Sequence, residues 1–169
     1  MIVVLAGTSG IGKTTIGNML AARMGWVFED ADALHTAAQI AKMRSGHPLT
    51  DEDRWPWLAT VAAWMDQRIV AGESAVVACS ALKRSYREYL SHGRPAVQIV
   101  LLVADPETLT ARLAERHGHF FPAALLLSQL ADLQMPDDAE RTCVVAAVHS
   151  AAEITDEIIR RLGLTGADG

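Results

Sequence analysis

The sequence has little cysteine and no long apolar run. Its 169 residues include two cysteines, Cys79 and Cys143, and both lie in apolar, strand-like segments. Two cysteines exclude a disulfide framework, and their spacing is not that of a zinc site, so we expect reduced core cysteines in a cytoplasmic protein. No apolar stretch approaches the roughly 20 residues that span a bilayer. The first residues show no signal-peptide pattern, and we therefore expect no contact with a membrane.

Basic residues are also in the minority, with 15 Lys and Arg against 20 Asp and Glu, for a net charge of −5. This balance provides no electrostatic footprint for nucleic acid. Lysine is the scarcest charged residue, because Lys13, Lys42 and Lys83 stand against twelve arginines. Lysine is therefore not used as general surface charge, and each lysine is a candidate for a specific role.

The length and the 50% hydrophobic content predict a single soluble domain. Short runs rich in Val, Ile and Leu alternate with helical patterns, which is typical of a parallel sheet covered on both faces by helices. We predict an α/β fold without repeats or linkers. The expected strands are 2–6, 26–29, 75–80, 98–103 and 143–148. The expected helices are 13–24, 33–44, 53–71, 83–91, 106–116, 122–133 and 151–162.

The strongest motif lies between the first expected strand and the first expected helix. It matches G-x-x-x-x-G-K-[ST], a P-loop, whose backbone N–H groups and helix N-terminus bind phosphate. Lys13 would reach the β- and γ-phosphates of a nucleotide, and the Thr14 hydroxyl would ligate Mg²⁺. Thr15 would pack in the helix or contact the α-phosphate. The expected nucleotide-binding residues here are Gly7, Thr8, Ser9, Gly10, Ile11, Gly12, Lys13, Thr14 and Thr15.

A P-loop indicates a nucleotide but not a reaction. The chain has no Asn-Lys-x-Asp segment for guanine, and the third strand does not end in the Asp of a motor or transport ATPase. Asp105 follows an apolar strand, but Pro106 after it favours a helix N-cap followed by proline at the first helical position.

Polar side chains follow the second strand, at the edge where doubly wound sheets bind ligands. They are Asp30, Asp32 and His35. A carboxylate at Asp32 could orient an acceptor hydroxyl and take its proton, or hold Mg²⁺ through water; the alternative is a helix N-cap. For Asp30 we expect a structural role.

Cations gather beyond two other elements. Arg54 would lie in the first turn of a helix, where a cation is unfavourable unless it has an anionic partner such as a substrate carboxylate. Ser80, Lys83 and Arg87 follow the third strand, and the last two would share a helix face. Two like charges on one face indicate an anion between them; the alternative is a solvated basic face.

Together these segments closely resemble gluconokinases, in the shikimate-kinase-like group of P-loop kinases. The resemblance covers nearly the whole chain. It rests on the P-loop, Asp-x-Leu-His, Lys-Met-x-x-Gly-x-Pro-Leu-x-Asp-x-Asp-Arg-x-Pro-Trp-Leu, Cys-Ser-Ala-Leu-Lys-Arg-x-Tyr-Arg, His-Phe-Phe, Ser128-Gln129 and Pro136. It implies a five-stranded parallel sheet of order 2-3-1-4-5 and a mobile lid, about 112–136. It also implies a homodimer that phosphorylates D-gluconate to 6-phosphogluconate with ATP and Mg²⁺.

The resemblance also assigns residue roles. Arg112 matches a position that stacks on adenine, and Arg116 one that reaches the phosphates and joins Lys13 and Asp32 as a catalytic candidate. For His117 and His119 we expect lid packing or capping rather than acid–base chemistry. The expected substrate-binding residues are Asp32, His35, Lys42, Arg54, Ser80, Lys83, Arg87 and His119.

The chain departs from the family pattern at Ala31, Thr36 and Gln39, where Gly, Pro and Asn are usual, which puts the shape of the substrate loop in question. One alternative function is a kinase of another sugar acid or of shikimate, although shikimate kinases carry Gly-Gly-Gly where this chain has Ser80-Ala81-Leu82. Another is a non-catalytic nucleotide-binding regulator, against which the intact Lys13, Thr14, Asp32 and Arg116 argue.

Overall fold

The computed structural model describes residues 1–114 and 123–165 of the chain. Its centre is a five-stranded sheet in the order β2-β3-β1-β4-β5, in which every neighbouring pair is parallel. This arrangement confirms the expected α/β P-loop kinase fold. The strands are Ile2–Ala6 (β1), Val27–Asp30 (β2), Ala75–Ala78 (β3), Val97–Val103 (β4) and Thr142–Ala146 (β5).

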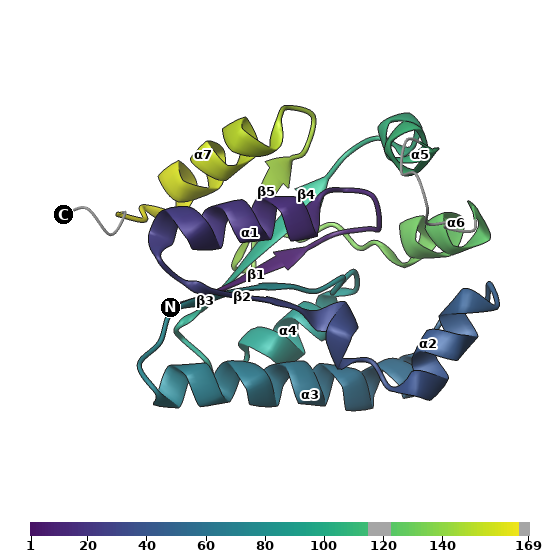
Figure 1. Cartoon of the computed structure of the whole chain (residues 1–169), viewed down its shortest axis with the longest axis horizontal. Helices are drawn as coiled ribbons and strands as arrows, with labels where there is room; N and C mark the ends of the chain where they lie inside the picture. Colours follow the sequence, from purple (N-terminus) through teal and green to yellow (C-terminus); the bar gives the residue numbers. More distant parts are fainter. Residues whose placement is uncertain (115–122, 166–169) are drawn as a thin grey trace.

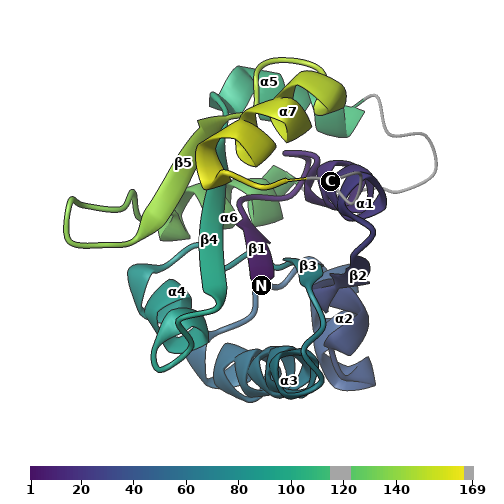
Figure 2. The ribbon, with the colours of Figure 1, turned by 90° about the vertical axis from the view of Figure 1, so that its left-hand side faces the viewer.

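Helices cover both faces of the sheet (Figures 1 and 2). Helices α1 (Lys13–Met24) and α7 (Ala151–Leu162) lie on one face, and α3 (Asp51–Val70) and α4 (Arg84–Ser91) on the other. The shorter elements gather beyond the carboxyl ends of the strands, at the right of Figure 1. They are the 3₁₀ helix η1 (Ala31–Leu34), α2 (Ala37–Arg44), α5 (Pro106–Ala114) and α6 (Ala123–Asp132). None of the described helices is long and apolar enough to cross a bilayer.

The apolar run of β1 is continuous because both of its faces are buried. Ile2 and Val4 pack with α3 and α4, whereas Val3 and Leu5 pack with α1 and α7. Successive side chains of a strand point to opposite faces, so a strand covered on both sides needs an apolar residue at every position. Each fully buried Val, Leu or Ile stabilises the fold by about 1.5–3 kcal/mol. The sheet is therefore a rigid platform for the residues at its carboxyl edge.

The prediction of one helix over residues 33–44 is wrong about where the helix begins. The chain forms η1, passes through His35 in an extended conformation, and starts α2 only at Ala37. Thr36 is the N-cap: its hydroxyl accepts from the Gln39 backbone N–H, and the Gln39 side chain accepts from the Thr36 N–H. Two of the departures from the family pattern thus form a capping box, which fixes the entry of the chain into α2.

The expected cap at Asp105 is confirmed, and a further cap lies at the start of α3. Thr50 caps α3 through a capping box with Asp53. Asp105 accepts from the Thr108 N–H and hydroxyl, both at 2.7 Å, which is the geometry of an N-cap rather than of a metal-binding aspartate. The two cysteines are unpaired, as expected, and burial raises the pKa of the Cys79 thiol to about 12. That thiol therefore stays protonated and inert at neutral pH.

Candidate active site

The P-loop joins β1 to α1 and owes its path to glycines. Gly10 and Gly12 have φ values of 80° and 101°, in the left-handed region. A Cβ atom on Gly7 would lie 2.8 Å from the Leu102 backbone oxygen, so a side chain would push the loop away from β4. The loop therefore turns tightly into the N-terminus of α1, the arrangement in which backbone N–H groups can surround a phosphate.

Two side chains hold this loop from within the site. The Lys13 ammonium donates to the backbone oxygens of Gly7 and Thr8, at 3.0 and 2.9 Å. Gln129 of α6 accepts from the Ser9 N–H at 2.6 Å and donates to the Ser9 hydroxyl at 3.1 Å. The loop is thus linked both to its own lysine and to the helix across the site.

Thr14 and Asp30 provide a site that suits a magnesium ion. The Thr14 hydroxyl donates to one Asp30 carboxylate oxygen at 2.7 Å, and the other accepts from the Asp32 N–H at 3.0 Å. Asp30 therefore caps η1, as expected of a structural residue, and also faces the P-loop. Mg²⁺ prefers oxygen ligands and usually keeps phosphate and water in its shell. Among the described residues, no cluster of three or more His, Cys, Asp or Glu could hold a metal ion.

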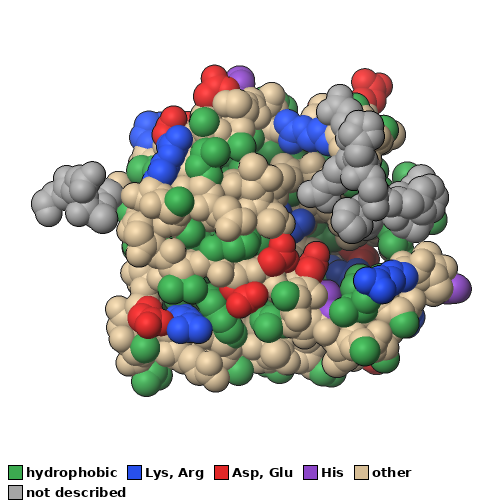
Figure 3. Space-filling model, in the orientation of Figure 1, with side chains coloured by type: hydrophobic (Ala, Val, Ile, Leu, Met, Phe, Trp, Pro, Cys, Tyr) green, Lys and Arg blue, Asp and Glu red, His purple; other side chains and the backbone are tan. Residues whose placement is uncertain are grey.

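A cavity of about 260 Å³ opens beside the P-loop, at the carboxyl edge of the sheet. Figure 3 shows acidic and basic side chains around a hollow above α2. The sequence-predicted residues that line this cavity are Ser9, Lys13, Asp32, His35, Arg54 and Ser80. The other lining residues are Met43, Arg44, Pro48, Leu49, Trp57, Leu125, Ser128 and Gln129. Polar groups on mostly apolar walls are typical of a small-molecule site.

Asp32 lies in the cavity beside His35. The His35 Nε2 atom is 3.7 Å from the Asp32 carboxylate, and the imidazole stacks on Trp57 at 4.3 Å between ring centroids. Neighbouring protein atoms that displace water raise the pKa of Asp32, but the interactions with His35 and Lys13 outweigh this effect, and the pKa lies below 3.8. Asp32 is therefore a carboxylate at neutral pH, ready to accept a hydrogen bond from a substrate hydroxyl.

Arg54 reaches the cavity from the first turn of α3. Its side chain is 8% exposed, its Nε donates to the Leu49 backbone oxygen, and its Nη2 lies 3.5 Å from the Asp132 carboxylate. The anionic partner that its position requires is thus present in the protein itself. Lys83 lies behind it, 3.7 Å from Asp132, and donates to Asp51 at 2.7 Å. Lys83 does not line the cavity but shares a carboxylate with a residue that does.

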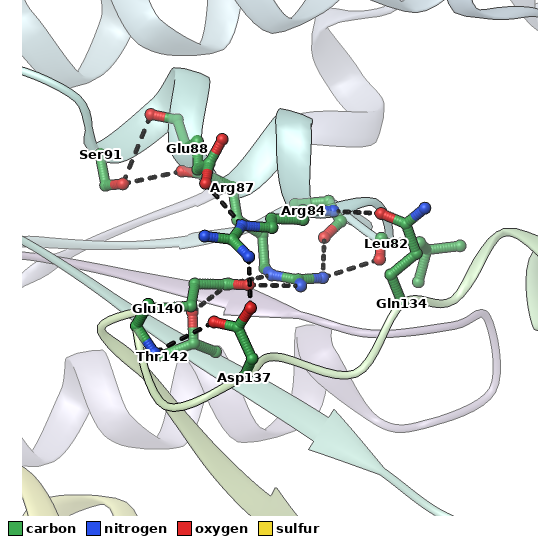
Figure 4. A network of polar contacts seen from close by, with 11 residues as sticks. Leu82, Arg84, Arg87, Glu88, Ser91, Gln134, Asp137, Glu140 and Thr142 are labelled. Atoms are coloured by element: carbon green, nitrogen blue, oxygen red, sulfur yellow. Dashed lines mark hydrogen bonds and ion pairs between the residues drawn. The ribbon is translucent and has the colours of Figure 1, made fainter.

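Arg87 does not take the predicted place in the substrate site. Lys83 is the N-cap of α4 and not part of a shared helix face. Arg87 is 1% exposed and forms a bidentate pair with Glu140, at 2.5 and 2.9 Å (Figure 4). It also donates to the Leu82 backbone oxygen at 2.7 Å. Each cation has its own carboxylate, so the inference that they need a shared anion was wrong.

Lys42 also lies apart from the cavity lining. Its ammonium donates to Asp53 at 2.6 Å, and Gln39 donates to the Asp53 backbone oxygen at 2.6 Å. Lys42 therefore attaches α2 to the start of α3. In this position it orients the helix whose last residue, Arg44, lines the cavity.

A second groove, of about 240 Å³, lies on the other side of the P-loop. Arg112 of α5 lines it and donates to the Ile11 backbone oxygen at 3.4 Å. The remaining lining residues are Gly10, Ile11, Gly12, Thr15, Ile16, His149, Ala151 and Ile154. The groove thus adjoins the phosphate loop, where a nucleoside would have to extend. Arg116, His117 and His119 lie outside the described residues, and the lid stays a prediction.

Sequence reasoning missed some of the cavity lining. Ser128 and Gln129 were part of the quoted family pattern, but no local signal placed α6 against the P-loop. Arg44 occupies an x position of the Lys-Met-x-x-Gly motif. A positive charge is common at the end of a helix, so the residue gave no functional signal. Only the path of the chain between α2 and α3 brings it to the cavity.

A P-loop beside a cavity that contains a carboxylate defines the class: the fold and the site are those of a P-loop kinase that acts on a small molecule. Residues 2–136 match the family described as "AAA domain". The chain is 46% identical to the gluconokinase of Gluconobacter oxydans (strain 621H), over 93% of this chain and 88% of that protein. The chain belongs to the gluconokinase family.

Solved structures agree with this assignment. A sugar kinase from Janibacter sp. HTCC2649 superposes with a TM-score of 0.92 at 43% identity, over 98% of this chain and 96% of that one. A gluconokinase from Sinorhizobium meliloti 1021 superposes with a TM-score of 0.85 at 41% identity, over 95% and 90%. The likeness thus extends over nearly the whole of each chain.

Proposed function

We propose that this protein transfers the γ-phosphoryl group of ATP to the 6-hydroxyl of D-gluconate, giving 6-phospho-D-gluconate and ADP. The observation that carries the proposal is the composition of the cavity, in which Lys13 and Asp32 lie at the P-loop and Arg54 enters from α3. An open-chain sugar acid has its carboxylate at one end and its terminal hydroxyl at the other. Binding the carboxylate near Arg54 directs that hydroxyl toward the P-loop.

In the transfer, a bond forms between the 6-oxygen and the γ-phosphorus as the bond from phosphorus to the β,γ-bridging oxygen breaks. Asp32 accepts a hydrogen bond from the hydroxyl, orients it and receives its proton. Its lowered pKa makes it a weak base, which suits a reaction dominated by positioning and electrostatic stabilisation. The P-loop N–H groups and Lys13 stabilise the charge on the transferred group. Arg116 is proposed to assist there.

Thr14 and Asp30 would hold Mg²⁺, which when bound neutralises phosphate charge. For the nucleoside, the groove beside Arg112 is the proposed site. Ser80 and His35 are proposed to contact the sugar-acid hydroxyls, with His119 as a further contact. A homodimer is part of the proposal on the family resemblance, and a cytoplasmic location is supported by the two unpaired cysteines.

The experiment is an ADP-release assay with Mg-ATP and a panel of acceptors: D-gluconate, shikimate, glucose and a nucleoside monophosphate. We expect gluconate to give by far the fastest release, and chelation of Mg²⁺ to abolish it. Equal rates with all acceptors, or no stimulation by gluconate, would overturn the proposed function.

A further inference from the structure

The charges around the substrate cavity are not balanced. Lys13, Arg44 and Arg54 are the lysine and arginine side chains of its described lining, and Asp32 is the only acidic one. Two of these cations already contact protein oxygens. Lys13 donates to P-loop carbonyls, and Arg54 lies 3.5 Å from Asp132.

Arg44 differs from both. Its residue is exposed, and no acidic side chain in residues 1–114 or 123–165 forms an ion pair with it. Figure 3 shows basic side chains among the charged groups beside the hollow above α2. A guanidinium that lines a cavity and has no carboxylate partner among the described residues is available to a carboxylate on a ligand.

The helix that carries Arg44 is attached in a particular way. No residue of α2 is fully buried, and the hydrogen bonds of Gln39 and Lys42 to Asp53 join it to α3. Arg44 is the last residue of α2. These attachments hold its backbone at the cavity while its long side chain remains adjustable. The family pattern Lys-Met-x-x-Gly leaves this position open, so the pattern by itself assigns no role to Arg44.

We infer that Arg44 is a specificity-determining residue that binds the carboxylate of the sugar-acid substrate, together with Arg54 of α3, which lines the same cavity. The inference rests on the proposed function, because it assigns a subsite of that same cavity. Asp132 partly neutralises Arg54, whereas Arg44 brings an additional positive charge and a planar fork that fits two carboxylate oxygens. Arg44 thereby favours acids over neutral polyols with the same terminal hydroxyl.

The competing explanation is a solvated cation at a helix C-terminus, where positive charge is favourable without any ligand. The variant Arg44→Gln removes the charge and keeps a polar side chain of similar reach. Arg160→Gln is the matched control, because Arg160 is also a basic residue in the last turn of a helix, α7, and is not part of the cavity lining. Arg44→Lys retains the charge but loses the fork.

Steady-state kinetics with gluconate and with its neutral analogue glucitol measures the effect, and calorimetric titration of gluconate without ATP measures binding independently of turnover. We expect Arg44→Gln to raise the KM and the Kd for gluconate about tenfold or more, as loss of a charged hydrogen bond does, and to reduce the preference for gluconate over glucitol. Arg44→Lys should be intermediate, with kcat and the KM for ATP unchanged throughout.

The inference is overturned if Arg44→Gln binds gluconate as tightly as Arg160→Gln does, or if the KM for ATP moves in place of the KM for gluconate. Its failure is distinguishable from that of the proposed function. A wild-type protein that binds gluconate through Arg44 but does not phosphorylate it would contradict the function and support the subsite. Absence of gluconate binding by the wild type would overturn both.

Discussion

The Arg87 guanidinium and the Glu140 carboxylate form a buried bidentate ion pair, with contacts of 2.5 and 2.9 Å and side-chain exposures of 1% and 6%. The pair joins α4 to the segment before β5 (Figure 4). Burial raises the pKa of Glu140, but hydrogen bonds from Arg87 and Thr142 outweigh it, so the pKa is lowered and the group is ionised. Arg87 is thereby committed to the fold and not to a substrate.

We predict that Glu140→Gln destabilises the protein by about 3–5 kcal/mol, because it leaves the Arg87 charge buried without its partner. The KM for gluconate should stay at the wild-type value. Chemical denaturation and steady-state kinetics measure the two quantities. Glu88→Gln is the control, since Glu88 pairs with Arg84 at the exposed surface, where solvent screens the pair, and its loss should change stability little. If Glu140→Gln raises the KM for gluconate and leaves stability unchanged, Arg87 acts in substrate binding and this account of the ion pair is wrong.

Asp32→Asn should reduce kcat about 10²-fold or more, as loss of a positioned proton acceptor does. The amide keeps the size of the side chain but not its charge. Nucleotide binding should persist, because the P-loop contacts of Lys13 do not involve Asp32. Nucleotide titration and turnover separate these effects. The side chain that caps η1 belongs to Asp30 and not to Asp32, so Asp32→Asn leaves the cap intact. A near-wild-type kcat would therefore exclude a role for the Asp32 carboxylate in the reaction.

Arg54→Lys should raise the KM for gluconate about tenfold or more and leave the KM for ATP nearly unchanged, since lysine keeps the charge but loses the bidentate fork. Arg94→Lys is the matched control: Arg94 makes a bidentate pair with Asp66 and is not among the cavity-lining residues. If the KM for ATP changes while the KM for gluconate does not, Arg54 contacts the phosphates of ATP and not the carboxylate of gluconate.

Asp53 should make stability depend on pH at the junction of α2 and α3. Hydrogen bonds from Lys42 and then from Thr50 lower the pKa of Asp53 from 3.8 to about 2. A carboxyl with a lowered folded-state pKa stabilises the fold fully above its unfolded value and loses that contribution as pH falls through the folded value. The Tm difference between wild type and Asp53→Asn should therefore shrink between pH 3.8 and about 2. A difference that is constant or grows over this range would contradict the account.

The sequence was sufficient for the sheet, the P-loop and several caps because each depends on local patterns. Continuous apolar strands fix a sheet covered on both faces, and the glycines before Lys13 fix the phosphate loop. Asp105 was recognisable as a cap from Pro106, the residue that follows it. The place of Asp32 beyond β2 followed from the general rule for doubly wound sheets.

The partners of the cations could not be predicted in this way. Glu140 and Asp132 reach Arg87 and Arg54 from segments far along the chain, and local rules show only that a cation needs an anion. The sequence therefore assigned Arg87 to a substrate although its carboxylate partner is Glu140, and it did not show that Asp132 approaches Arg54. It also did not single out Arg44, because the approach of α2 to α6 around the cavity is a tertiary feature.

The most direct test of the central claim is to identify the atom that receives the phosphate. After incubation of the protein with Mg-ATP and D-gluconate, proton-coupled phosphorus NMR reports the carbon to which the new phosphate ester is attached. A cavity that binds the carboxylate at Arg54 and presents the far hydroxyl to Lys13 and Asp32 predicts coupling to the protons on carbon 6 of gluconate. A phosphate on another carbon, or inorganic phosphate as the sole new phosphorus species besides ADP, would contradict it.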